Sequence, residues 1–153
     1  MAEALKTEVL SLRQEQLIRR GDAMLLLGCG DGLTGRWREA RLPATGPAGI
    51  LFTDGGPASI GGLYSFLAAM RDARRRARIT LLHSLTDERV GALVGAFLQA
   101  EGADYEIELD ADLPGRSTRI GPFQVELRPA LRGVGFRITA DGASIELRSG
   151  HDA

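Results

Sequence analysis

The sequence predicts a single α/β domain, and three observations support this. The chain has 153 residues, which is close to the length of one ordinary domain. Its 44% hydrophobic and 25% charged residues are typical of a globular protein. Short apolar runs alternate with helical patterns in the first two thirds of the chain, and strand-like runs follow. This order predicts helices between the early strands and a β-rich end.

The first elements are expected to form a hairpin and a short helix. Residues 8–18 partly alternate between polar and apolar, and the wholly apolar run 23–27 follows a turn signal at Gly21-Asp22. Two such runs joined by a glycine-containing turn predict a hairpin whose second strand is buried. A glycine cluster at 28–32 and a short polar helix around 34–41 come next.

Strand and helix patterns then alternate before the β-rich end. Ser59 is expected to cap a helix that continues to about Arg75, because apolar residues recur there at helical spacing. A second helical stripe ends at Gly102. Asp141-Gly142 is a two-residue hairpin signal between the last two strands. The expected strands are 50–53, 79–82, 105–109 and three strands between residues 123 and 147.

Charge and composition exclude several classes of protein. The net charge of −1 lacks the positive field that non-specific nucleic-acid binders use, so no nucleic-acid partner is expected. The arginines of 71–78 lie at a predicted helix end, where cations complement the helix dipole and stay solvated. Cys29 is the single cysteine, which fits a reducing compartment. Because no signal-peptide pattern or long apolar run is present, we expect a cytoplasmic protein without a membrane segment.

The glycine cluster permits one alternative function. The run from Leu25 to Gly32, Leu-Leu-Leu-Gly-Cys-Gly-Asp-Gly, resembles the first motif of S-adenosylmethionine-dependent methyltransferases. In that motif, glycines after a strand let the backbone approach the cofactor closely. Asp54, at the end of the next strand, would suit a ribose-binding acid. Leu26, however, stands where those enzymes place an acidic residue.

A second resemblance covers most of the chain from about Gln14 onward. Residues 26–32 resemble the strand and Asp-Cys-Gly-Glu-Gly turn of ribonuclease Z and its relatives in the metallo-β-lactamase fold. Residues 50–63 resemble the strand that runs into that family's Thr-His-x-His-x-Asp-His turn and the helix after it. Residues 123–127 and 135–138 resemble the strand pair beside a further metal histidine, and 147–150 the approach to a Ser-Gly-Asp-Thr motif.

The resemblance implies one half of an αββα sandwich: a mixed sheet covered by helices on one face, with residues 1–153 as a single domain. A lone half would expose the inner face of its sheet as an apolar patch. A homodimer that packs sheet on sheet, or a second chain that completes the sandwich, would bury this face. We therefore predict a partner, with a homodimer as the first expectation.

The family's metal ligands are missing from the matching positions. In the family, the His-x-His-x-Asp-His turn holds two zinc ions that activate a water for hydrolysis. Here the four ligand positions are Asp54, Gly56, Ala58 and Ser59. Glycine and alanine have no donor atoms, and serine is a poor zinc ligand.

Other possible ligands are few. The later family histidine falls near Leu131 or Arg132, and Asp152 is a possible remnant of the bridging aspartate. The chain has two histidines, His83 and His151, whereas a di-zinc hydrolase of this kind uses several. We therefore expect no metal, no cofactor and no catalytic residue.

The leading hypothesis is a catalytically degenerate relative, a pseudoenzyme that acts as a binding or structural subunit. The first alternative is a metal-dependent, ribonuclease Z-like phosphodiesterase with a residual site at Asp54, Asp152 and His151, or with a site completed by a partner. The second alternative is a small methyltransferase-like domain that binds S-adenosylmethionine at Gly28–Gly32. Ser59, between a strand and a helix, resembles a hydrolase nucleophile in position, but Pro57 replaces the first glycine of Gly-x-Ser-x-Gly.

Overall fold

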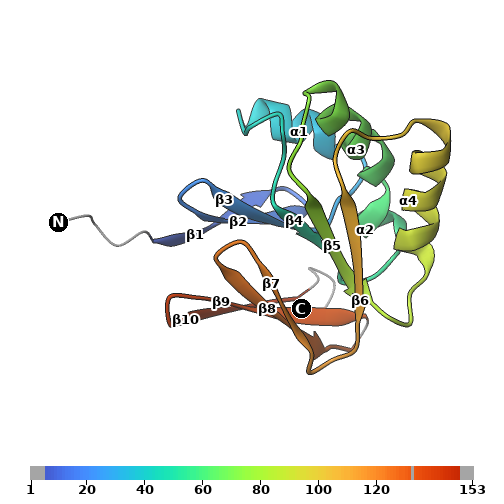
Figure 1. Cartoon of the computed structure of the whole chain (residues 1–153). Helices are drawn as coiled ribbons and strands as arrows, with labels where there is room; N and C mark the ends of the chain where they lie inside the picture. The colour runs from blue at the N-terminus through green and yellow to red at the C-terminus, as the bar shows by residue number, and fades with distance from the viewer. Residues whose placement is uncertain (1–5, 132, 149–153) are drawn as a thin grey trace.

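A six-stranded mixed sheet, here sheet A, lies at the centre of the molecule (Figure 1). The computed structural model describes residues 6–131 and 133–148, so Arg132, His151 and Asp152 lie outside the described residues. The strands follow one another in the sheet in the order of the sequence. The pairs β1–β2 and β2–β3 are antiparallel, and the pairs β3–β4, β4–β5 and β5–β6 are parallel. The strands are β1 (Thr7–Leu12), β2 (Glu15–Arg20), β3 (Ala23–Leu27), β4 (Gly49–Leu51), β5 (Ile79–Ser84) and β6 (Ile107–Asp112).

Helices cover one face of sheet A (Figure 1). Trp37 and Phe66 from two of these helices meet edge to face, with ring centroids 5.3 Å apart, above the apolar side chains of the sheet. Burial of this amphipathic face stabilises the helices, since helices of this length are marginal alone. The helices are α1 (Leu33–Glu39), α2 (Pro57–Ile60), α3 (Leu63–Asp72) and α4 (Arg89–Ala100).

A second, four-stranded antiparallel sheet, sheet B, packs against the other face of sheet A (Figure 1). Ile18, Leu25 and Leu51 of sheet A and Phe123 and Phe136 of sheet B belong to one buried cluster between the two sheets. The layers are therefore helix, sheet and sheet. Sheet B has the order β10-β9-β8-β7 and consists of β7 (Ser117–Ile120), β8 (Phe123–Pro129), β9 (Val134–Ala140) and β10 (Ala143–Leu147).

The prediction that the inner face of the sheet is exposed is wrong. The β-rich end of the chain folds back and covers this face with its own alternating apolar side chains. The outer face of sheet B is polar: Arg137 pairs with Glu146 at 2.7 Å, and the hydroxyls of Thr139 and Ser144 lie 3.0 Å apart. A polar outer face needs no apolar cover.

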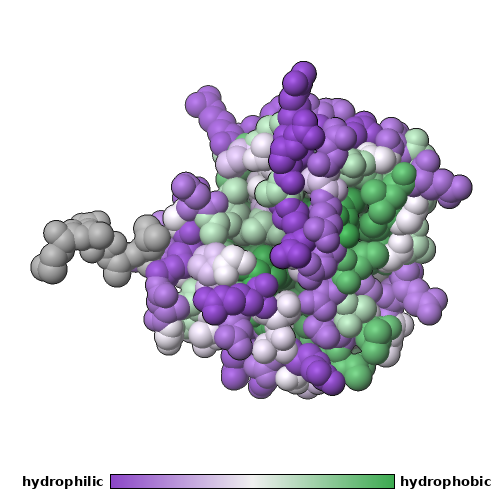
Figure 2. All heavy atoms as spheres, viewed as in Figure 1, coloured by the Kyte–Doolittle hydropathy of each residue, from purple (hydrophilic) through white to green (hydrophobic). Residues whose placement is uncertain are grey.

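The predicted homodimer therefore loses the interface that motivated it. Large apolar side chains stay exposed elsewhere, including Leu98 of α4 and Leu109 of β6 at 47% and 43%. Figure 2 shows apolar side chains gathered over the α4 side of the molecule. Self-association stays a prediction, and light scattering at micromolar concentration tests it: a dimer mass supports it and a monomer contradicts it.

Several boundaries differ from those predicted. Residues 8–18 form two strands, because the chain turns at Arg13, which adopts a φ of 70° without a glycine to mark the turn. Ser117–Ile120 forms a strand, β7, that the sequence analysis did not predict. The hairpin turn at Asp141-Gly142 is confirmed, with both residues at positive φ. None of the helices among residues 6–131 and 133–148 has the length and apolar character that crossing a membrane requires.

The predicted capping role of Ser59 is wrong. Ser59 lies within α2, whose N-cap residue is Gly56, and α3 begins separately after Gly62. The single predicted helix is divided at Gly61-Gly62, because the N–H of Gly62 donates to the carbonyl of Cys29, outside the helix, at 2.9 Å. A tertiary hydrogen bond thus overrides the helical spacing of the apolar residues.

Candidate functional site

The candidate site lies where the β3, β4 and β5 strands of sheet A end. Thr53 to Ser59, here the 53–59 turn, follows β4 and includes the first three residues of α2. The glycine loop 28–32 follows β3 and lies beside this turn: the N–H of Cys29 donates to the carbonyl of Ser59 at 2.6 Å. Because parallel strands deliver their carboxyl ends to one edge of a sheet, these loops meet where open α/β sheets commonly bind ligands.

Close backbone packing holds the glycine loop in place. A Cβ added to Gly62 would lie 2.1 Å from the carbonyl oxygen of Gly30, and a Cβ on Gly30 would lie 2.7 Å from that of Ala58. These distances leave no room for a side chain, which explains the glycines by packing. The space beside Gly30 is filled by protein, so the structure adds no support for S-adenosylmethionine binding there.

A buried ion pair, which the sequence analysis did not predict, stabilises the glycine loop. The Glu15 carboxylate, 1% exposed, accepts hydrogen bonds from the Arg36 guanidinium at 2.7 Å and from the N–H of Gly30 at 3.1 Å. Paired and hydrogen-bonded in this way, a carboxylate can remain charged inside a protein. The sequence gives one sign of this ion pair: Glu15 is an acidic residue on the same face of its strand as the buried, apolar Leu17.

Cys29 lies beside this ion pair and is fully buried. Burial, together with the nearby Glu15 carboxylate, raises the pKa of the Cys29 thiol well above its ordinary value, against a smaller opposing effect of Arg36. The thiol therefore stays protonated at neutral pH and packs as a small apolar side chain.

The 53–59 turn is held by hydrogen bonds within it and to a neighbouring loop. The Asp54 carboxylate accepts the N–H of Gly56 at 2.7 Å, which closes a local turn. The loop before β9, where the family places its later metal histidine, joins the same turn. The N–H of Val134 donates to the carbonyl of Thr53 at 2.8 Å, and a Cβ on Gly133 would lie 1.9 Å from that oxygen.

A further ion pair flanks the turn at the start of α4. Arg89 donates to the Asp87 carboxylate at 2.7 Å. The hydrogen bond from Arg89 lowers the pKa of Asp87 to about 2. Gly55 packs against this pair, since an added Cβ would lie 2.6 Å from both the Asp87 carboxylate and the Arg89 guanidinium. The charges of Asp87 and Arg89 are therefore paired with each other beside the turn.

The residues that the structure brings together do not fit a zinc centre. The side chains of Gly56 and Ala58 offer no donor atom, Asp54 is the one carboxylate of the turn, and Leu131 is 94% exposed with an apolar side chain. His83 is buried, with Nδ1 lying 3.0 Å from the carbonyl of Ser84. Across the described ranges, no group of three or more His, Cys, Asp or Glu side chains is placed to hold a metal ion.

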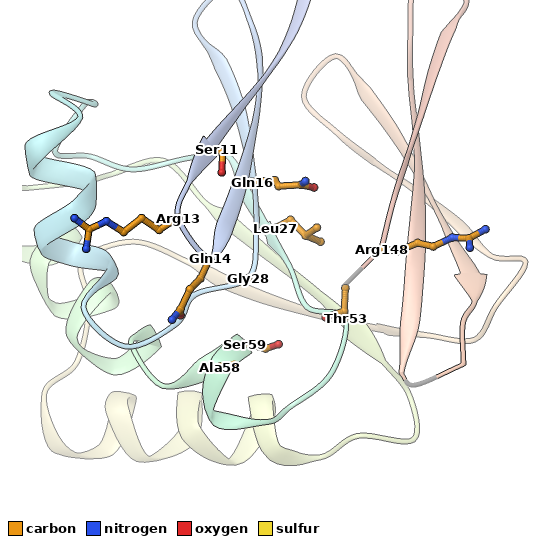
Figure 3. A pocket seen from close by; sticks show the side chains of 10 residues that line it. All are labelled: Ser11, Arg13, Gln14, Gln16, Leu27, Gly28, Thr53, Ala58, Ser59 and Arg148. Carbon is orange, nitrogen blue, oxygen red and sulfur yellow. The ribbon is translucent and has the colours of Figure 1, made fainter. Parts of the chain in front are cut away.

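A cavity of about 320 Å³ opens beside the 53–59 turn, between the ends of the two sheets (Figure 3). Its walls come from the β1–β2 turn, β2, the end of β3, the 53–59 turn and Arg148 after β10. Ala58 and Ser59, two of the four predicted ligand positions, line it, whereas Asp54 and Gly56 do not. The sequence analysis did not predict Gln16 or Thr53 as lining residues.

Comparisons with known proteins find similar solved structures but no similar sequence family. No protein-family model matches the sequence, and no curated protein matches it either. Among solved structures, the metallo-β-lactamase fold protein YhfI from Bacillus subtilis matches with a TM-score of 0.65 and 16% identity, over 94% of this chain and 54% of that one. Human tRNase Z, short form, matches with a TM-score of 0.72 and 13% identity, over 88% of this chain and 61% of that one.

A zinc-bound relative of the same fold is also similar. PqqB from Methylobacterium extorquens, whose structure contains Zn²⁺, matches with a TM-score of 0.65 and 14% identity, over 94% of this chain and 50% of that one. The chain therefore spans about half to three fifths of the length of these proteins. At these identities the likeness establishes the metallo-β-lactamase fold, which the sequence resemblance had implied.

Proposed function

We propose that this chain, which has the metallo-β-lactamase fold, is a binding protein that has lost the two-metal hydrolytic chemistry. One observation carries the proposal: Gly56 and Ala58, two of the four positions that the resemblance assigns to metal ligands, have no side-chain donor atom, and the turn that contains them is held by protein hydrogen bonds. The Asp54 carboxylate binds the N–H of Gly56, and the carbonyl of Ser59 binds the N–H of Cys29.

The packing of the turn supports this proposal further. In a two-metal site, the ions help to hold ligand loops together and supply the nucleophile. Here the glycine loop, the 53–59 turn and the loop before β9 are joined by backbone hydrogen bonds and by the contacts of Gly62 and Gly133. Contacts within the protein therefore join the loops of the site, and the adjoining cavity offers room for a ligand.

Hydrolysis of a phosphodiester is the activity that tests the proposal, because one of the structural neighbours is a tRNase Z. We expect the full chain to show no rate above the blank with bis(4-nitrophenyl) phosphate, before or after addition of Zn²⁺ or Mn²⁺. The physical reason is the absence of donor atoms at Gly56 and Ala58. The measurement is the release of 4-nitrophenolate, followed by its absorbance.

The Asp54→Asn variant is the matched control for this assay. It keeps the size of the side chain and the oxygen that accepts the N–H of Gly56, but it removes the one charged donor of the turn. If the wild type hydrolyses the substrate in a metal-dependent way and Asp54→Asn abolishes the rate, the chain is a hydrolase with a residual site. The proposal is then contradicted.

A further inference from the structure

The cavity beside the 53–59 turn has an unusual polar wall. Strand β2 alternates, so Glu15 and Leu17 face the helices while Gln16 and Ile18 face sheet B. Ile18 is buried between the sheets, but Gln16, two residues nearer the start of β2, reaches the cavity. Figure 3 shows the Gln16 side chain projecting from β2 into the space between the sheets.

The Gln16 amide is incompletely hydrogen-bonded. Its Oε1 atom is buried and has no hydrogen-bond partner within the part of the chain that the structure describes. Native proteins satisfy nearly all such atoms, because a buried polar group without a partner is costly. A turn of the amide about its last bond, which is a soft torsion, presents either its oxygen or its NH₂ group to the cavity.

Hydroxyl groups and one apolar side chain complete the inner wall. Thr53 and Ser59, 5% and 9% exposed, line the same space from the opposite loop, and each carries a hydroxyl group. Leu27 adds an apolar surface beside Gln16 (Figure 3). An amide and two hydroxyls around an apolar patch can bind a ligand with several polar groups and a carbon skeleton.

The charged side chains nearest to the cavity point away from its centre. In Figure 3 the side chains of Arg13 and Arg148, which line the rim, point outward from its centre. Glu15 lies on the other face of β2 and is paired with Arg36. The inner wall formed by Gln16, Leu27, Thr53 and Ser59 is therefore neutral, which favours an uncharged ligand, since an anion would meet a counter-charge only at the rim.

We propose that this cavity binds a small uncharged polyol of about monosaccharide size, an inference that rests on the proposed non-hydrolytic binding function. Each hydroxyl of a polyol both donates and accepts, so it can satisfy the Gln16 amide and the hydroxyls of Thr53 and Ser59 together. The volume of about 320 Å³ holds about ten water molecules at about 30 Å³ each, which matches a ligand with about ten heavy atoms.

The test is a titration of the full, isotope-labelled chain with D-ribose and myo-inositol, followed by amide chemical shifts. We expect saturable shifts at Thr53, Ser59 and the Gln16 side-chain NH₂ group, with a dissociation constant in the millimolar range, as is usual for about ten heavy atoms. D-Ribose 5-phosphate serves as the anionic counterpart and should bind at least about tenfold more weakly than D-ribose, because the neutral wall cannot pair its charge.

The Gln16→Leu variant separates a ligand-binding role from a structural one. It should lose at least about tenfold in affinity for D-ribose, and its melting temperature should rise by about 2–4 °C, because a buried polar atom without a partner is removed. The control is Gln124→Leu on the exposed outer face of β8, where the amide donates to the Ser117 hydroxyl. Gln124→Leu should leave ribose binding unchanged.

Three results would overturn the inference: no saturable shift with either neutral polyol, stronger binding of the phosphate ester than of ribose, or ribose affinity that survives Gln16→Leu. Zinc content is measured on the same sample. A metal-free chain that fails to bind the polyols rejects this ligand class and leaves the non-hydrolytic proposal intact. A chain with stoichiometric zinc rejects the proposed function itself.

Discussion

Replacement of Arg36 by methionine is expected to lower the free energy of unfolding by about 3–5 kcal/mol. The substitution removes all three hydrogen bonds from the guanidinium to Glu15 and leaves a carboxylate that is 1% exposed with only the N–H of Gly30. A buried charge without its partner is costly because the interior solvates it poorly. Chemical denaturation followed by circular dichroism measures the effect.

Two variants control this prediction. Arg19→Met removes an exposed ion pair with Glu8, in which the two side chains are 41% and 55% exposed, and should cost only about 0–1 kcal/mol. The double variant Glu15→Leu/Arg36→Met removes both charges and should recover most of the lost stability. If Arg36→Met costs no more than Arg19→Met, the buried pair does not hold the glycine loop and our description of the site is wrong.

Gly62→Ala is expected to cost at least about 3 kcal/mol, since the new Cβ would lie 2.1 Å from the carbonyl oxygen of Gly30. That oxygen belongs to the backbone and cannot move without opening the contact between the glycine loop and the start of α3. For a chain of this size the loss corresponds to a fall in melting temperature of about 6–12 °C. Differential scanning calorimetry gives this shift directly.

Gly95→Ala is the matched control for Gly62→Ala. Gly95 lies within α4, and an added Cβ there would meet nothing within 4 Å. Alanine favours a helix over glycine by about 0.5–1 kcal/mol, so Gly95→Ala should stabilise the chain slightly. Equal effects of the two variants would show that Gly62 is not held in close contact.

The fold could be predicted from the sequence to the extent that local patterns determine it. The apolar runs of β3, β4 and β5 and the stripes of α3 and α4 are local signals, and they predicted strand or helix correctly, although the helix predicted from Ser59 to Arg75 is divided into α2 and α3. The turn at Arg13 could not be predicted, because arginine rarely adopts a positive φ and nothing in the neighbouring sequence marks it. The covering of sheet A by sheet B is a long-range contact, and periodicity gives no information on it.

Only part of the candidate site could be predicted from the sequence. The resemblance assigned Asp54, Gly56, Ala58 and Ser59 to one segment after a strand, and these residues do follow β4. That this segment lies beside the glycine loop was not predicted. The packing role of the glycines was not predicted, because it depends on backbone atoms distant in the sequence. The roles of Glu15 and Gln16 depend on which face of β2 each occupies, and that requires the correct boundaries of the hairpin.

The central claim is that this member of the metallo-β-lactamase fold keeps the ligand turn without a metal centre. Calorimetric titration of the full chain with Zn²⁺, together with elemental analysis of the untitrated protein, tests it most directly, because the full chain also contains His151 and Asp152. We expect less than about 0.1 zinc per chain and no saturable binding with a dissociation constant below about 100 µM. One or two zinc ions per chain, bound with a dissociation constant of about 1 µM or less, would contradict the claim.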